Sequence, residues 1–211
     1  MINSSQSHLF WGSSSPLATL SCGGLLIMAT VRFSYAIIIS GSLLWVYCLS
    51  VLVSQSATRI FPRRGVFFLQ TFLTSVMAGI FLLLLWLVCP LAAIEVFFIV
   101  SLVPLFCIFS GIFQRIKSLD LSEAVTLAAT ESAVICLLLL ILSLIREPLG
   151  LLSLSLPGGS QGIVFIFSGD SEALLPMRII ASSSGALLLL GYCVGLYRHY
   201  RGIIAPGETG I

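Results

Sequence analysis

Long apolar runs separated by short polar segments dominate this sequence. A helix needs about 20 apolar residues to cross a bilayer, at a rise of about 1.5 Å per residue. The run from Pro16 to Val53 carries one charge, Arg32, and is too long for a single crossing, so we divide it there into a short and a full segment. Further segments follow at about 66–88, 91–113, 124–145 and 174–197. The pattern predicts six transmembrane helices.

Prolines set several of the expected helix ends and breaks. Cys89-Pro90 should end the third segment, because proline lacks an N–H donor and disfavours helix at the residue before it. The fourth segment contains Pro104 in its interior, followed by Cys107 and Gly111, and is expected to be a broken helix. The first segment, with Pro16 and the glycines that follow Cys22, is expected to be broken as well.

The fifth segment has a charged end. Arg146-Glu147-Pro148 is expected to stop this helix, with the two long side chains reaching toward the membrane surface. Residues 149–173 are then expected to form a loop rich in glycine and serine. The last apolar segment leads into a basic tail, Arg198-His199-Tyr200-Arg201.

Composition supports a polytopic membrane protein. Of 211 residues, 58% are hydrophobic and only 9% are charged, against about 25% charged in soluble domains. This excludes a soluble enzyme or a nucleic-acid binder, and the net charge of +2 gives no argument for an anionic partner. Glycine-rich nucleotide loops and zinc-protease motifs are absent from the sequence, so the chain alone offers no complete active site.

The distribution of basic residues predicts the orientation. Lysine and arginine favour the cytoplasmic side of short loops. Placing both termini in the cytoplasm puts seven basic residues inside and leaves three outside, namely Arg32, Arg146 and Arg178. We expect a multi-pass protein of a bacterial inner membrane, with both termini cytoplasmic.

Six segments divide into two groups of three, in which the second group would insert upside down relative to the first. The expectation is therefore an all-α membrane domain, 1–211, built from two inverted three-helix repeats. The halves would cover about 9–90 and 91–201, with a polar tail at 202–211. Each half opens with its broken helix, and a pseudo-two-fold axis would bring Cys22 and Cys107 close together near the midplane.

Two converging thiolates in a low-dielectric interior favour a bound metal, since soft thiolate ligands bind zinc, copper(I) or iron-sulfur clusters. A [2Fe–2S] cluster needs four cysteines, so a second chain would have to supply two. The alternative is that both cysteines only pack, because free cysteine behaves as a small buried hydrophobe. The other four cysteines, at 48, 89, 136 and 193, are expected to pack in this way.

Glu131 falls inside the fifth segment, where a carboxylate is costly enough to suggest a function. A role in a proton or sodium pathway is one reading. A neutral or hydroxyl-bonded Glu131 near the membrane surface is equally consistent with the sequence.

Several motifs, in order, resemble the E-type protein of the Rnf ion-translocating electron transport complex and the related D-type protein of the sodium-pumping NADH:quinone reductase. Residues 9–17 (LFWGSSSPL) are similar to the family's Leu-Trp-x-Asn-Asn-x-x-Leu lead into its first half-helix. Residues 104–111 (PLFCIFSG) resemble its Pro-Leu-Ile-x-x-Asn-Cys-x-x-x-Gly segment. Residues 143–150 (SLIREPLG) resemble its Arg-Glu-x-x-Gly ending of the fifth span, and 207–210 (GETG) the tail of some members.

The resemblance implies a component of a ferredoxin:NAD oxidoreductase that moves Na⁺ or H⁺. In that family the E-type protein pairs with a homologous, inverted partner of the A type, and the two share one intramembrane [2Fe–2S] cluster with two cysteines from each. By resemblance, Cys22 and Cys107 are this chain's ligands. Other components, carrying FMN and iron-sulfur centres, would hand electrons to and from the pair.

This chain departs from the family pattern at several positions. Phe106 stands before the second cysteine in place of asparagine, and 112–114 (IFQ) replaces a basic-acidic stretch. The start of the fifth segment, 128–131 (AATE), lacks the family's glycines. Such changes could shift the potential of a cluster. The alternatives are an inverted-repeat solute transporter and a structural subunit without a cluster.

Overall fold

The computed structural model describes residues 28–58, 65–116, 119–158, 162–168, 180 and 182–204. Its elements, in chain order, are α3 (Phe33–Thr58), α4 (Val66–Val88), α5 (Pro90–Ser101), α6 (Val103–Phe109), α7 (Ile112–Arg115), α8 (Leu121–Leu151), β1 (Ser153–Pro157), β2 (Ile163–Ser168) and α10 (Ser183–Ile204). The described chain is mostly helical. The expected first segment and Cys22 lie outside the described residues.

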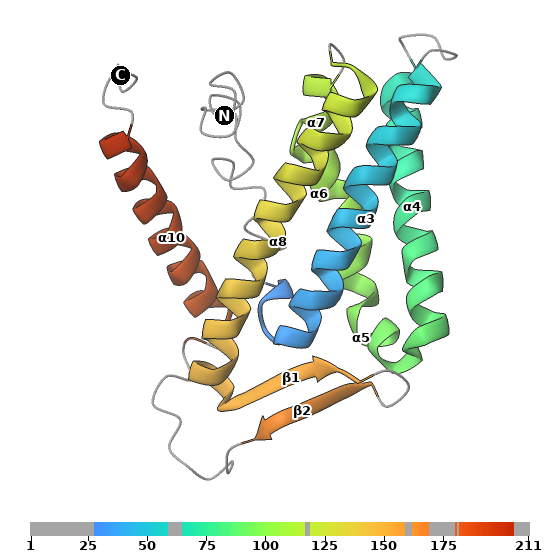
Figure 1. Cartoon of the computed structure of the whole chain (residues 1–211). Coiled ribbons are helices and arrows are strands. Elements are labelled where there is room, and N and C mark those ends of the chain that lie inside the picture. The colour runs from blue at the N-terminus through green and yellow to red at the C-terminus, as the bar shows by residue number, and fades with distance from the viewer. Residues whose placement is uncertain are drawn as a thin grey trace.

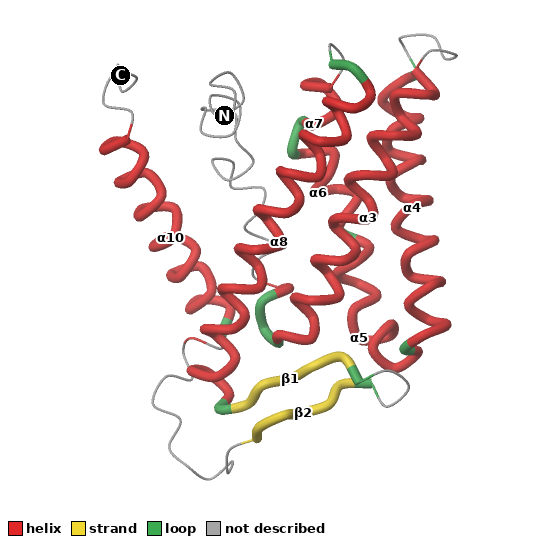
Figure 2. The backbone as a smooth tube through the Cα atoms, viewed as in Figure 1, coloured by secondary structure: helices red, strands yellow, loops and turns green. Residues whose placement is uncertain are grey.

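The helices form a bundle with α3 at its centre (Figure 1). On one side α3 packs along α8, and on the other it contacts α4, α5 and α6. The two strands lie across one end of the bundle, and α10 slants outside α8 (Figure 2). Helix α7 lies at the end of the bundle opposite the strands (Figure 1).

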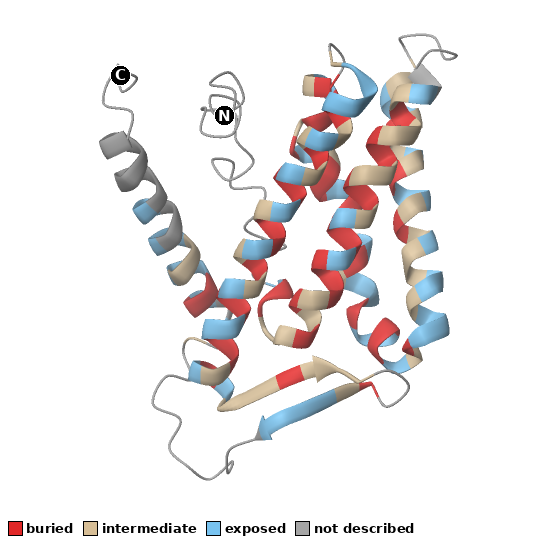
Figure 3. Ribbon diagram, in the orientation of Figure 1, coloured by how far each residue is buried: buried red, intermediate tan, exposed pale blue. Residues whose placement is uncertain are grey.

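Burial differs sharply between helices (Figure 3). In the most apolar stretch of α3, 56% of the residues are buried, against 11% in α4. The buried faces of α3 and α8 carry small residues such as Ala36, Ala128 and Ser132, which allow close helix packing in a membrane. The thiol of Cys136 donates to the carbonyl oxygen of Ser40 at 3.2 Å across this contact. The exposed apolar face of α4 is what a lipid-facing helix presents.

Four stretches of helix are long and apolar enough to cross a membrane: Phe33–Ser56, Val66–Val88, Pro90–Arg115 and Leu121–Leu151. They correspond to the second to fifth predicted segments. The sixth corresponds to α10, which is not among these four and whose last turns carry Arg198, His199 and Arg201. The described chain thus confirms a membrane protein of several helices, while six spans and the inverted repeat stay predictions.

The two proline predictions in the third and fourth segments are confirmed. Helix α4 ends at Val88, and Cys89 has the non-helical angles φ −140° and ψ 78°. Pro90 then occupies the first turn of α5, where its missing N–H costs nothing. The fourth segment is broken twice, at Leu102 just before Pro104 and at Ser110-Gly111.

The predicted end of the fifth segment is wrong. Helix α8 continues through Arg146, Glu147 and Pro148 to Leu151, and it ends at Leu152, whose φ is 48°. Pro148 lies only four residues from the C-cap, so it removes a single hydrogen bond near an end that is held by other contacts. Arg146 and Glu147 are 2% and 0% exposed, so they do not reach to the membrane surface.

The expected loop at 149–173 contains an antiparallel hairpin, which is the one departure from an all-α fold among the described residues. Leu154 pairs with Phe167 and Ser155 with Phe165, so Ile166 is an extra residue in a β-bulge. Alternating apolar residues in β1 and a β-branched and aromatic run in β2 are typical of strands. In the sequence, the glycines that flank these two strands favour a loop, which is why the hairpin is not predicted.

Candidate functional site

The second break of the fourth segment positions the candidate site. Gly111 adopts φ +70°, a left-handed conformation that is accessible to glycine at little cost, and it separates α6 from the single turn of α7. The hydroxyl of Ser110 donates to the carbonyl oxygen of Cys107 at 2.8 Å. Part of the backbone freed at this turn is therefore satisfied by the chain's own side chain.

Cys107 lies in the short middle piece, α6, and is fully buried. Its neighbour Phe106 packs against the ring of Tyr47 on α3, with ring centroids 6.1 Å apart. The predicted ligand thus lies inside the bundle.

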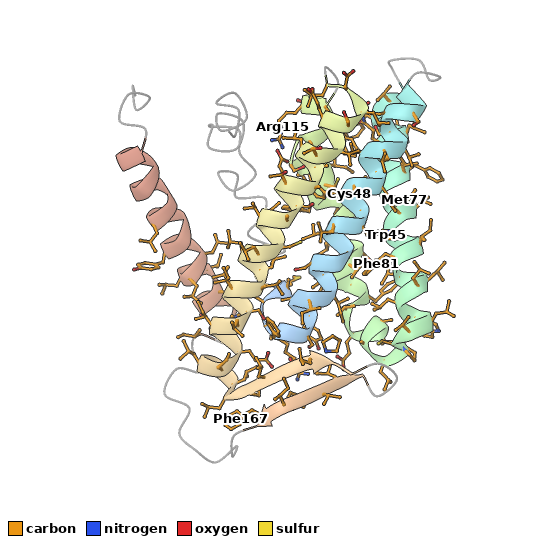
Figure 4. The ribbon with its side chains drawn as sticks, viewed as in Figure 1. Trp45, Cys48, Met77, Phe81, Arg115 and Phe167 are labelled. Atoms are coloured by element: carbon orange, nitrogen blue, oxygen red, sulfur yellow. The ribbon has the colours of Figure 1, made fainter. Side chains whose placement is uncertain are left out.

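Glu131 is 2% exposed and forms an ion pair with Arg115. Both carboxylate oxygens of Glu131 accept from the guanidinium, the second at 3.0 Å from Nη2. Nη2 of Arg115 also donates to the carbonyl oxygen of Ser110 at 3.0 Å, so the same side chain holds the helix break. Figure 4 shows Arg115 at the end of the bundle away from the hairpin. Glu131 is therefore buried, and its carboxylate is paired with a guanidinium rather than with a hydroxyl.

Arg115 is the functional candidate that sequence reasoning missed. The sequence predicts a charged connector from Gln114 to Glu123, between the fourth and fifth segments, and Arg115 falls within it. The available signal was its spacing: Arg115 ends one helix and Glu131 lies 16 residues later, in the antiparallel helix that follows a short connector. Two oppositely charged residues on either side of a short connector can meet when the two helices pack against each other.

The described residues place one of the two expected cysteine ligands, and Cys22 lies outside them. Within the described part of the chain, no group of three or more His, Cys, Asp or Glu side chains is placed to hold a metal ion. Cys48, Cys89 and Cys136 are free thiols there. A cluster shared between chains would need only two thiols from this one, so Cys107 is a compatible donor and does not make a site by itself.

The position of Cys107 differs in register from the family pattern. In that pattern the cysteine follows the proline by six residues, whereas Cys107 follows Pro104 by three. The sixth position is Ser110, at the break itself. A test of cluster ligation therefore has to change Cys107 and, separately, Ser110.

A second buried polar group lies at the hairpin end of the bundle. Arg146 donates from Nη1 to the hydroxyl of Thr30 at 2.8 Å, and from Nε and Nη2 to the carbonyl oxygens of Ile180 at 2.8 Å and Ser182 at 2.9 Å. Glu147 accepts from the backbone N–H of Phe33 at 2.6 Å. These two residues join the ends of three helices.

Comparisons with known proteins leave the family open. No protein-family model matches the chain, and no curated protein matches it either. The resemblance to the E-type Rnf protein therefore rests on the motifs at 9–17, 104–111, 143–150 and 207–210.

Proposed function

We propose that the chain is the E-type membrane component of an Rnf-type electron transport complex, in the inner membrane of a bacterium with both termini cytoplasmic. Its role would be to relay electrons through a [2Fe–2S] cluster shared with a homologous inverted partner, coupled to movement of Na⁺ or H⁺. The observation that carries the proposal is a fully buried Cys107 in the middle piece of a doubly broken apolar span. The ordered motifs at 9–17, 104–111 and 143–150 support it.

Two side chains beside Cys107 have roles in this proposal. When bound, the cluster would supply one-electron transfer across part of the membrane thickness. Arg115 donates to the carbonyl oxygen of Ser110, so it would hold the helix break that follows Cys107. Glu131 balances Arg115 in the paired arrangement. For Glu131 to bind a proton or a sodium ion, its ion pair with Arg115 must first open.

The test is iron content and low-temperature EPR on the complex purified from native membranes. Wild type is compared with Cys22→Ser, Cys107→Ser and Ser110→Ala, and Cys136→Ser serves as a matched control because Cys136 is also buried and lies in a spanning helix. We expect Cys22→Ser and Cys107→Ser to lose a [2Fe–2S] signal in an assembled complex, while Ser110→Ala and Cys136→Ser keep it. An unchanged signal and iron content in Cys22→Ser and Cys107→Ser would overturn the proposal.

A solute transporter is the second candidate, and the partly buried Arg115–Glu131 pair favours it. Paired charges within membrane helices mark solute or ion pathways, and inverted-repeat transporters build their sites at broken helices. This candidate predicts no cluster signal in wild type. It also predicts that Glu131→Gln abolishes uptake of a polar solute by vesicles that contain this chain.

A further inference from the structure

The hairpin has an unusual surface for a segment outside the helices. Val164, Phe165, Ile166 and Phe167 of β2 are all exposed, so both faces of this strand present large apolar side chains. The sequence from 149 to 169 contains no charged residue. A two-stranded hairpin is marginal in water, and exposing four such side chains there would be unfavourable.

The hairpin is fixed to the membrane-spanning helices. The buried hydroxyl of Ser155 on β1 donates to the hydroxyl of Ser34 at 3.1 Å and accepts from the Ser34 N–H at 3.3 Å. Beside the turn, a Cβ built on Gly162 would come within 3.2 Å of Cβ of Leu91, in the first turn of α5. Leu91 and nearby Val88 are exposed and apolar. The surface of β2 is therefore continuous with the lipid-facing ends of α4 and α5.

Polar side chains near the hairpin indicate where this end of the bundle lies relative to the membrane surface. The guanidinium of Arg32 lies 5.5 Å from the ring centre of Phe165 and 5.8 Å from that of Tyr35. The hydroxyl of Tyr35 donates to Glu95 on α5 at 3.1 Å. Aromatic rings together with a cation and a carboxylate are typical of the membrane–water interface.

The backbone of β2 also limits how deep this strand can lie in the bilayer. Within the described sheet, β2 pairs only with β1, so its outer edge has N–H and C=O groups that need partners. Hydrocarbon offers none, whereas the headgroup region does. The bulge at Ile166 also disfavours addition of another strand to this edge.

From these observations we infer that the β1–β2 hairpin lies in the membrane–water interface and that Val164–Phe167 contact phospholipid. The hairpin would be an in-plane anchor that sets the height of α3, α5 and α8 in the bilayer. This inference requires only a membrane protein and is independent of the proposed electron-transfer function.

Photo-crosslinking in native membranes separates lipid from other occupants. Benzoylphenylalanine is introduced at Phe167, which is 61% exposed and lies on the hairpin (Figure 4). Phe97 on α5, 60% exposed, is the lipid-facing control, and Phe106, 4% exposed, is the buried control. We expect phospholipid adducts at Phe167 and Phe97, detected by mass, and none at Phe106. A protein adduct at Phe167, or no adduct there while Phe97 reacts, would overturn the inference.

Depth is measured on a second variant, Phe167→Trp, reconstituted into vesicles of brominated phosphatidylcholine. The fluorescence that this tryptophan adds to the parent protein should be quenched more by bromine at acyl carbons 6 and 7 than at carbons 11 and 12. Stronger quenching by the deeper bromine would place β2 in the hydrocarbon, and absence of quenching would place it in water. Either result contradicts an interfacial hairpin.

Discussion

Each end of the bundle holds an arginine and a glutamate, of which Glu131, Arg146 and Glu147 are buried, and the two ends use these charges differently. At the break between α6 and α7, Arg115 and Glu131 bind each other directly. At the hairpin end, Arg146 donates to a hydroxyl and two backbone carbonyls, and Glu147 accepts from a backbone N–H of another helix. The first arrangement joins two charges, and the second uses each charge to hold separate segments of the chain.

This difference determines what each end can do. Opening the Arg115–Glu131 pair would break few contacts beyond the pair itself and the bond from Arg115 to Ser110. It would leave two charges without partners, so a proton or an ion would have to compensate them. Arg146 and Glu147 fix the start of α3, the end of α8 and the residues before α10. Moving Arg146 would remove the donor of two backbone carbonyls, and moving Glu147 would remove the acceptor of one backbone N–H. We therefore interpret the hairpin end as structural and the helix break as the functional end.

The largest effect is expected from removing both charges at the hairpin end. Arg146→Met and Glu147→Leu each remove a partner of buried groups in another segment, so the double variant should lose roughly 5 kcal/mol of unfolding free energy. The measurement is SDS-induced unfolding in mixed micelles. Arg32→Met is the control, since the contacts of Arg32 with two aromatic rings are worth only about 1 kcal/mol. A double variant as stable as wild type would show that the two residues act as a pair.

The opposite pattern is expected at the helix break. Arg115→Met leaves the carboxylate of Glu131 buried without its partner and should cost about 3–5 kcal/mol. Adding Glu131→Leu should restore most of this stability, because no isolated charge then remains. In the single variant the loss should shrink as pH falls, since protonation removes the stranded charge.

The same unfolding assay checks this prediction, and Arg115→Lys, which keeps the charge, is the control. If the double variant were less stable than Arg115→Met, the Arg115–Glu131 pair would be a structural tie like the residues at the other end. The comparison between the two ends would then fail.

Sequence patterns predicted the apolar helices better than the polar contacts between them. The length of α4, its end at Cys89-Pro90 and the broken fourth segment follow from local rules for apolar runs and proline. The burial of Arg146 and Glu147 could not be predicted in this way, because their partners are Thr30, Phe33 and the backbone near 180, more than 30 residues away. The same limit applies to Arg115, whose role depends on how α7 and α8 are placed.

The smallest effect concerns the backbone at the break. Gly111 has φ +70°, and a Cβ built there would meet nothing within 4 Å, so Gly111→Ala tests the conformation alone and should cost about 1 kcal/mol. Gly79 in α4 also has open space around it, but its φ is helical, so Gly79→Ala should stabilise by up to about 1 kcal/mol. Both are measured by the same unfolding titration. If both variants were stabilised, the left-handed turn between α6 and α7 would not be needed, and Arg115 would reach Glu131 equally well from a continuous helix.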